Sequence, residues 1–281
     1  MPTTIAIIGA GAMGSAVGHR LTQHGARVLT LADGRSAKTV ARIRDAGMEP
    51  VVIDEIAAAD LILSIVPPAE AIGVAELLSP KLRDAKTKSA FIDFNAINPA
   101  TMQQITSTLA GTGWDVLDGA IIGSPPTAES TGPKFYVSGD QARHSSLLEK
   151  HGLNLRLMEA PVGAASALKM VYAGLNKGLV GLGATMLLAA AGSGSAESLR
   201  GEMNDSLPEL LLRFQKSIPD MYPKAYRWVA EMHEIAEFLG PDDPGSALFK
   251  AMADVFARIA ADQNADGQLA AILNGVLENP A

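Results

Sequence analysis

The chain has 281 residues, of which 48% are hydrophobic and 19% are charged, and this composition is typical of a soluble globular protein. The net charge of −7 is spread along the chain without a basic block, so we expect no nucleic-acid partner. Because the sequence contains no cysteine, disulfides, thiolate catalysis and thiolate-bound metals are excluded. The amino-terminus carries no export signal, and the longest uncharged apolar run, residues 178–192, is shorter than the ~20 residues that span a bilayer. We therefore expect a cytoplasmic protein without a membrane segment.

The first 160 residues alternate between short apolar runs and segments with helical periodicity. Apolar strands separated by amphipathic helices are typical of a parallel sheet covered on both faces. The expected fold class is therefore α/β, with a doubly wound, Rossmann-type sheet. The apolar runs predict strands at residues 3–9, 27–32, 51–54, 59–66, 89–95, 114–122, 134–140 and 154–159. The intervening segments predict helices at residues 15–25, 36–47, 69–82, 99–113 and 141–151.

After Pro161 the pattern changes, because no later segment has the character of a strand. We expect a dinucleotide-binding domain at residues 1–161 and an all-helical domain at residues 162–281. Helical periodicity predicts helices at residues 162–191, 207–218, 223–239 and 246–263, with breaks at residues 192–195 and 240–245.

The sequence GAGAMG follows the first predicted strand and begins the first predicted helix. Gly9, Gly11 and Gly14 have the G-x-G-x-x-G spacing, which provides a tight turn, close approach of the backbone to a pyrophosphate and close helix–strand packing. The phosphate charge would meet the helix N-terminus at Ala12 and Met13. A glycine-rich turn without a ligand explains this context poorly, so the motif predicts a nicotinamide dinucleotide.

The end of the second predicted strand bears on the choice between NAD and NADP. An acid at this position favours NAD because it binds the ribose 2′-hydroxyl, whereas arginine and serine suit a 2′-phosphate. Asp33 is followed by Arg35 and Ser36, and the usual position of the acid falls nearer Ala32. We therefore favour NADP(H), with Arg35 and Ser36 as phosphate ligands, while NAD(H) stays possible.

Two further strands end in segments that we expect at the cofactor edge of the sheet. Val66 and Pro67 are expected to pack against the cofactor, and Asn95 to bind the nicotinamide ribose or carboxamide. Asp93 is expected to be structural, because aspartates at strand ends commonly fasten the following turn.

A single lysine interrupts the apolar helix that follows Pro161. Ser166, Lys169, Tyr172 and Asn176 recur at steps of three and four, which places them on one helix face. Such a stripe could simply meet water. Because the helix begins where the dinucleotide domain ends, the stripe could also line a cleft in which substrate meets nicotinamide.

At this point the sequence resembles the β-hydroxyacid dehydrogenases, a family that includes 3-hydroxyisobutyrate and 6-phosphogluconate dehydrogenases. The resemblance covers nearly the whole chain and is closest to a branch with a short, distinct helical C-terminal domain. The family's glycine motif corresponds to residues 5–25, its substrate loop to residues 118–126 and its lysine-bearing helix to residues 163–178. The resemblance implies that Lys169 is the general acid/base and that the helical domain binds substrate and forms a homodimer.

The substrate residues depart from the family's pattern. The family's asparagine four residues after the lysine is replaced by Ala173, and Asn176 one turn later is a candidate substitute. The serine of the family's substrate loop corresponds to Ile122, which leaves Gly123 and Ser124 as candidate substrate contacts. Tyr172, on the same face as Lys169, is a further candidate.

These features favour an NADP(H)-dependent oxidoreductase that transfers hydride to or from a small hydroxy or oxo compound, with a β-hydroxy acid as one candidate. One alternative is an imine reductase, although related imine reductases usually replace the lysine. A second alternative is a non-catalytic dinucleotide sensor, suggested by Ala173 and Ile122. No histidine and carboxylate have metal-ligand spacing, so we expect no metal.

Overall fold

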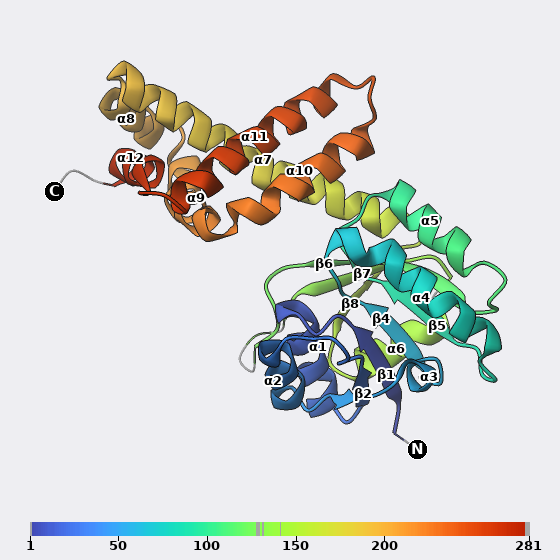
Figure 1. Ribbon diagram of the computed structural model, residues 1–281. Coiled ribbons are helices and arrows are strands. Elements are labelled where there is room, and N and C mark those ends of the chain that lie inside the picture. The colour runs from blue at the N-terminus through green and yellow to red at the C-terminus, as the bar shows by residue number, and fades with distance from the viewer. Residues whose placement is uncertain (1, 128–129, 131, 141, 279–281) are drawn as a thin grey trace. The chain divides into compact units, whose positions relative to one another are not determined.

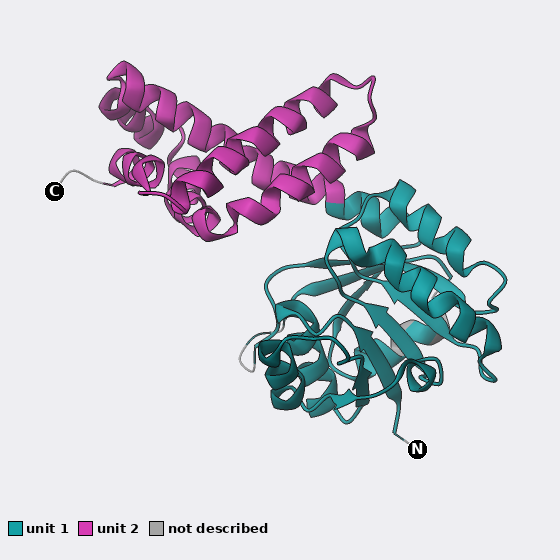
Figure 2. Ribbon diagram, viewed as in Figure 1, with its two compact units in different colours: residues 1–169 teal, residues 170–281 magenta. Residues whose placement is uncertain are grey.

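The computed structural model describes residues 2–127, 130, 132–140 and 142–278. The chain divides into two compact units, residues 1–169 and residues 170–281, drawn in teal and magenta in Figure 2. Within the described residues, every strand belongs to one eight-stranded sheet in the first unit, and the second unit is helical.

The sheet of the first unit, whose strands are the arrows in Figure 1, has the strand order β3-β2-β1-β4-β5-β6-β7-β8. Neighbouring strands run parallel, except that β6 and β7 are antiparallel. The predicted Rossmann-type fold is therefore confirmed. The strands are β1 (Thr4–Ile8), β2 (Arg27–Thr30), β3 (Glu49–Pro50), β4 (Leu61–Ser64), β5 (Ala90–Asp93), β6 (Asp115–Ile122), β7 (Lys134–Ser138) and β8 (Asn154–Leu157). The helices are α1 (Ala12–Gln23), α2 (Ala37–Asp45), α3 (Ile53–Ile56), α4 (Ala71–Asp84), α5 (Pro99–Leu109) and α6 (Ala142–Lys150), with a 3₁₀ turn at Pro68–Glu70.

The sheet is buried on both faces, as the apolar strands predict. In β1, Ile5 and Ile7 belong to the same core cluster as Leu21 of α1. Ile8 belongs to the opposite cluster, together with Leu78 of α4. Helices therefore cover both faces of the central strands.

The strand order reverses between β1 and β4, which pair in parallel with Ile8 opposite Ser64. The turn at residues 9–11 and the segment at residues 65–67 consequently leave the sheet at the same edge. Open α/β sheets bind ligands at this reversal, outside the carboxyl ends of their strands.

The strand predicted at residues 51–54 is wrong. The structure has a two-residue strand at Glu49–Pro50 and begins α3 at Ile53. Asp54 and Glu55 occupy the first turn of α3, where the helix dipole favours acidic side chains. This local preference outweighs the strand propensity of the two valines that precede the helix.

The second unit contains the greater part of α7 (Ala164–Ser193) and five further helices. Their apolar side chains form one core, in which Met232 and Phe256 are fully buried. Neither α8 nor α12 was predicted, since α8 buries only Met203 along a polar sequence and α12 is short and almost uniformly apolar. The helices are α8 (Ala196–Ser206), α9 (Pro208–Met221), α10 (Ala225–Leu239), α11 (Pro244–Gln263) and α12 (Gln268–Leu277), with a 3₁₀ turn at Tyr222–Lys224.

By length and composition alone, α7 is able to cross a membrane, although the core helix of a globular protein meets the same criterion. Of its most apolar window, 44% is buried inside the protein. A Cβ atom on Gly181 would lie 2.0 Å from the sulfur of Met252, and one on Gly183 would lie 2.6 Å from the ring of Phe214. These glycines therefore allow close helix packing within the second unit.

Candidate active site

The three glycines after β1 differ in what surrounds them. Gly9 has φ +105°, and a Cβ atom there would lie 2.3 Å from the carbonyl oxygen of Ile65. A Cβ atom on Gly14 would lie 1.9 Å from the carbonyl oxygen of Gly9. Among the described residues other than Gly11 and its two chain neighbours, no atom lies within 4 Å of a Cβ built on Gly11. Gly9 and Gly14 are therefore required by the turn itself, whereas Gly11 borders open space in which a ligand could approach the backbone.

The amino-terminus of α1 faces this open space. Gly11 is the N-cap and makes no side-chain capping hydrogen bond, and Ala12 is exposed at the first helical position. Met13 is half-buried and packs against the core. An uncapped helix N-terminus beside an open glycine turn suits a phosphate, because its amide groups and dipole attract negative charge.

The segment after β4 is fastened to the end of β5 by Asn95, which is 3% exposed. Its Oδ1 accepts a hydrogen bond of 2.6 Å from the amide of Val66. Its Nδ2 donates to Oγ of Ser64 at 2.9 Å and to Oδ2 of Asp93 at 2.6 Å. The Asn95 side chain thus holds Val66 and the exposed Pro67 at the sheet edge, and its contact with nicotinamide stays a prediction.

Asp93 lies beneath this network and is 1% exposed. Its Oδ1 accepts the amide hydrogen of Asn95 at 2.8 Å. Burial raises the pKa of Asp93 to about 7, and the nearby Asp118 carboxylate adds to the shift, while the hydrogen bonds from Asn95 and Ser64 oppose it. A fastening role for Asp93 agrees with these contacts.

The turn after β2 carries both an acidic and a basic side chain. The amide of Arg35 donates to the carbonyl of Ala32 at 3.1 Å, and Asp33 and Arg35 are both exposed. Ser36 is the N-cap of α2, where its hydroxyl accepts a hydrogen bond of 3.3 Å from the amide of Thr39. The Ser36 hydroxyl thus caps α2. Arg35 belongs to the same turn, directly before Ser36.

The start of α7 is anchored to β6 by Asp118, which is fully buried. Oδ2 of Asp118 accepts hydrogen bonds of 2.9 Å from the amides of both Gly163 and Ser166, and one of 3.1 Å from the hydroxyl of Ser138. Oδ1 accepts the hydroxyl of Ser166 at 2.5 Å. Burial raises the pKa of Asp118, and the hydrogen bonds from Ser166 oppose that shift. Asp118 therefore caps the first turn of α7.

Lys169 follows Ser166 by three residues and extends toward the same strand. Its Nζ donates a hydrogen bond of 2.7 Å to the carbonyl oxygen of Ile121 in β6. Burial lowers the pKa of the ammonium group, because the charged form loses hydration. Within the first unit, the side chains of Ser166 and Lys169 thus bond to residues of β6 and do not form a solvent-exposed polar face of the helix.

The loop after β6 carries the other residues expected at the substrate. Gly123 has φ +130°, and a Cβ atom there would lie 3.1 Å from Cα of Pro133. Ser124 follows and is exposed. The loop therefore begins with a close contact between its two ends and presents Ser124 to the surface.

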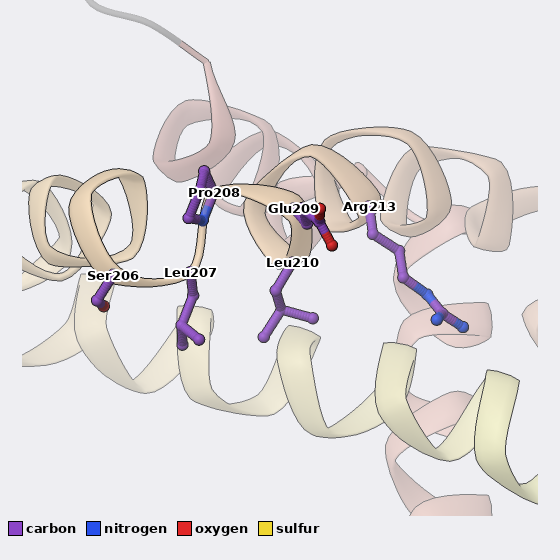
Figure 3. A pocket seen from close by; sticks show the side chains of 6 residues that line it. All are labelled: Ser206, Leu207, Pro208, Glu209, Leu210 and Arg213. Carbon is purple, nitrogen blue, oxygen red and sulfur yellow. The ribbon is translucent and has the colours of Figure 1, made fainter.

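Tyr172 and Asn176 belong to the second unit. Nδ2 of Asn176 donates to the carbonyl of Tyr172 at 2.9 Å, and Oδ1 accepts from Arg213 at 2.7 Å. The sequence alone does not indicate Arg213, because nothing in the chain order of α7 and α9 shows which of their side chains meet. Arg213 also lines a pocket of about 520 Å³, into which Leu207 and Leu210 project (Figure 3).

Among the described residues, no three histidine, aspartate or glutamate side chains gather as a metal site.

Two family models match the chain. Residues 4–158 match the NAD binding domain of 6-phosphogluconate dehydrogenase. Residues 190–259 match a domain of unknown function, DUF1932. The first match covers more than half of the chain and confirms the family resemblance that the sequence motifs indicate.

Solved structures share this architecture. The chain is 20% identical to 3-hydroxyisobutyrate dehydrogenase from Mycobacterium tuberculosis, with a TM-score of 0.76 over 98% of this chain and 99% of that one. It is 26% identical to a conserved hypothetical protein from Sinorhizobium meliloti, with a TM-score of 0.75 over 98% and 97% of the two chains. An imine reductase from Myxococcus stipitatus, solved with NADP+ and as a variant with NAD+, gives a TM-score of 0.55 in both cases. The identities are 16% and 19%, over 98% and 99% of this chain and all of the other.

Proposed function

Because the chain belongs to the family defined by the NAD binding domain of 6-phosphogluconate dehydrogenase, we propose that it is an NADP(H)-dependent oxidoreductase acting on a small hydroxy or oxo compound. A β-hydroxy acid is the first candidate substrate. The dinucleotide supplies or accepts the hydride when bound. The proposed cofactor contacts are Gly9, Gly11, Ala12, Met13, Gly14, Val66 and Pro67, with Arg35 and Ser36 at a 2′-phosphate.

The observation that carries the proposal is the placement of Lys169. Its amine is largely buried, its pKa is lowered by burial, and its hydrogen bond to Ile121 directs it to the carboxyl end of β6. The contact between Asp118 and Ser166 fixes the helix turn from which it extends. Because its pKa is lowered, this lysine gives up its proton more readily than a lysine in water, which suits it to proton exchange with a substrate.

The chemistry assigned to Lys169 follows from charge. During reduction, a carbonyl oxygen gains negative charge as hydride reaches its carbon, and the ammonium group donates a proton to that oxygen. The product is the alcohol, and the lysine is left neutral. During oxidation, the neutral amine accepts the hydroxyl proton as hydride leaves the carbon.

Imine reduction is the second candidate, supported by the likeness in fold to the Myxococcus enzyme. In that reaction the ammonium group of Lys169 would donate its proton to nitrogen instead of oxygen. A non-catalytic dinucleotide sensor is the third, because Ala173 and Ile122 replace residues that the family resemblance leads us to expect at the substrate.

One experiment separates the three candidates. The purified full chain is assayed with NADPH and NADH against oxo acids and cyclic imines, and with the oxidised cofactors against hydroxy acids. We expect NADPH-dependent turnover of at least one oxo acid. Turnover of imines alone would favour the second candidate, and tight cofactor binding without any turnover would favour the third.

We further propose that the chain is a cytoplasmic homodimer assembled through its helical unit. Four large apolar side chains of α7 are half or more exposed, namely Val171, Leu175, Leu182 and Met186. Their spacing of three to four residues, or multiples of it, places them along one side of the helix. A second copy of the chain would remove this apolar surface from water.

A further inference from the structure

In the loop between β6 and β7, the described residues contact one another. Besides the contact between Gly123 and Pro133, a Cβ atom on Gly132 would lie 3.1 Å from Cβ of Pro126. The hydroxyl of Ser130 accepts hydrogen bonds from the amides of Thr127 at 3.1 Å and of Gly132 at 3.3 Å. The two ends of this loop are therefore adjacent, and such contacts are also found in Ω-loops, which often carry function.

Arg20, in the last turn of α1, connects this loop to the helix that follows the glycine motif. Its Nη2 donates a hydrogen bond of 2.8 Å to the carbonyl oxygen of Thr127 and one of 2.7 Å to that of Ser130. The two hydrogens of a single guanidinium nitrogen thus join segments that are 107 and 110 residues apart in the chain. Charge-assisted bonds of this kind are stronger than bonds between neutral groups.

We propose that Arg20 is a positioning residue that holds the loop carrying Ser124 against the dinucleotide helix and thereby sets the affinity for the substrate. This inference rests on the proposed function, because it takes the loop as the substrate loop and α1 as the cofactor helix. Arg20 itself touches neither ligand. It lies at the opposite end of α1 from Gly11, so its loss should leave the phosphate-binding turn intact.

Arginine is specifically suited to this role. Its planar fork presents two hydrogens from one nitrogen in fixed directions, whereas a lysine ammonium is a compact group on a flexible stem. Arg20→Lys should therefore hold the loop only partly, and Arg20→Met, which keeps an apolar stem, should release it. Arg83, an exposed arginine in the last turn of α4, provides the matched control Arg83→Met.

The first test is hydrogen–deuterium exchange of the full chain, read on peptides from residues 123–133, without ligand. In Arg20→Met these amides should exchange at least ~10-fold faster than in the wild type, while Arg83→Met leaves them unchanged. The affinity for NADPH, measured by fluorescence titration, should stay within about threefold. Equal exchange in the wild type and Arg20→Met would overturn the proposal.

The second test is a kinetic one, using the compound turned over fastest in the oxo-acid and imine assay. Arg20→Met should raise KM by ~10-fold or more with kcat within about threefold, and Arg20→Lys should recover part of the loss. A lower kcat with unchanged KM would contradict a positioning role. If the wild type turns over none of the compounds, the proposed function fails, while the exchange experiment still decides whether Arg20 holds the loop.

Discussion

The hydroxyl of Ser166 lies 2.5 Å from Oδ1 of Asp118, and both side chains are almost fully buried in the first unit. This hydrogen bond joins the start of α7 to the middle of β6. Lys169, three residues later, reaches the carbonyl of Ile121 in the same strand. The carboxylate of Asp118 therefore fixes the turn from which the proposed acid/base extends.

Substitution of Gly14 and Gly11 should affect different properties, namely the stability of the fold and the affinity for the cofactor. Gly14→Ala should lower the free energy of unfolding by ~3 kcal/mol or more, since its methyl group meets the carbonyl of Gly9. Gly11→Ala should change stability by less than ~1 kcal/mol but weaken NADPH binding ~10-fold or more, because its methyl group enters the open space. Urea denaturation and NADPH titration of both variants measure this. Unchanged NADPH affinity in Gly11→Ala would argue against a pyrophosphate at this turn.

Arg35→Ala tests the preference for NADPH. Losing a charge-assisted contact to a 2′-phosphate should weaken NADPH binding by ~1.5–3 kcal/mol and leave NADH binding nearly unchanged. Asp33→Ala, in the same exposed turn, serves as the control and should not weaken NADPH. Tighter binding of NADH than NADPH by the wild type would instead assign the turn to a ribose hydroxyl at Asp33.

The titration of Asp93 should make stability depend on pH. Its pKa of about 7 in the folded chain exceeds the ~3.9 of an unfolded aspartate, so the folded state holds a proton that the unfolded state releases between these values. This contribution to stability is complete below pH ~4 and is lost as the pH rises to ~7. The unfolding free energy of the wild type, minus that of Asp93→Asn, should therefore decrease as the pH rises from ~4 to ~7. A constant difference from pH 4 to 8 would contradict the raised pKa.

Two charges on α7 should disrupt the proposed dimer. Light scattering of the wild type at micromolar concentration should give twice the chain mass of 29.2 kDa. The double variant Leu175→Glu, Leu182→Glu should be monomeric, since the exposed apolar side would then carry charge. Leu248→Glu, at an exposed leucine of α11, should leave the dimer intact. A wild-type mass of one chain would refute the assembly.

Periodicity sufficed to predict the fold class, because strands buried on both faces and amphipathic helices leave distinct patterns, as β1 and α1 do. It failed where the signal was short or mixed. The valines at positions 51 and 52 suggest a strand, while the acids in the first turn of α3 favour the helix that forms. The polar α8 and the short, apolar α12 lacked a clear apolar stripe.

The motifs identified the positions expected at the site but not the contacts among them. Spacing places Ser166 and Lys169 on one helix face, yet only the structure shows that Asp118 and the carbonyl of Ile121 accept their hydrogen bonds. Asn95 is expected to meet the cofactor, and only the structure shows that its amide also bonds to Ser64, Val66 and Asp93. Such long-range pairs depend on how strands and helices are brought together, which local sequence does not encode.

The central claim, that Lys169 exchanges a proton with the substrate, is tested most directly by the turnover of Lys169→Met. This substitution removes the donor and keeps the apolar stem, and Lys250→Met on the exposed side of α11 is its control. On the compound that the wild type reduces fastest, kcat should fall by ~10²–10⁴-fold in Lys169→Met and stay unchanged in Lys250→Met, with NADPH affinity within a few-fold in both. The wild-type rate of reduction should fall as the pH rises through the lowered pKa of Lys169, and this limb should be absent from the Lys169→Met profile. Turnover of Lys169→Met near the wild-type rate, with the pH limb intact, would contradict the account.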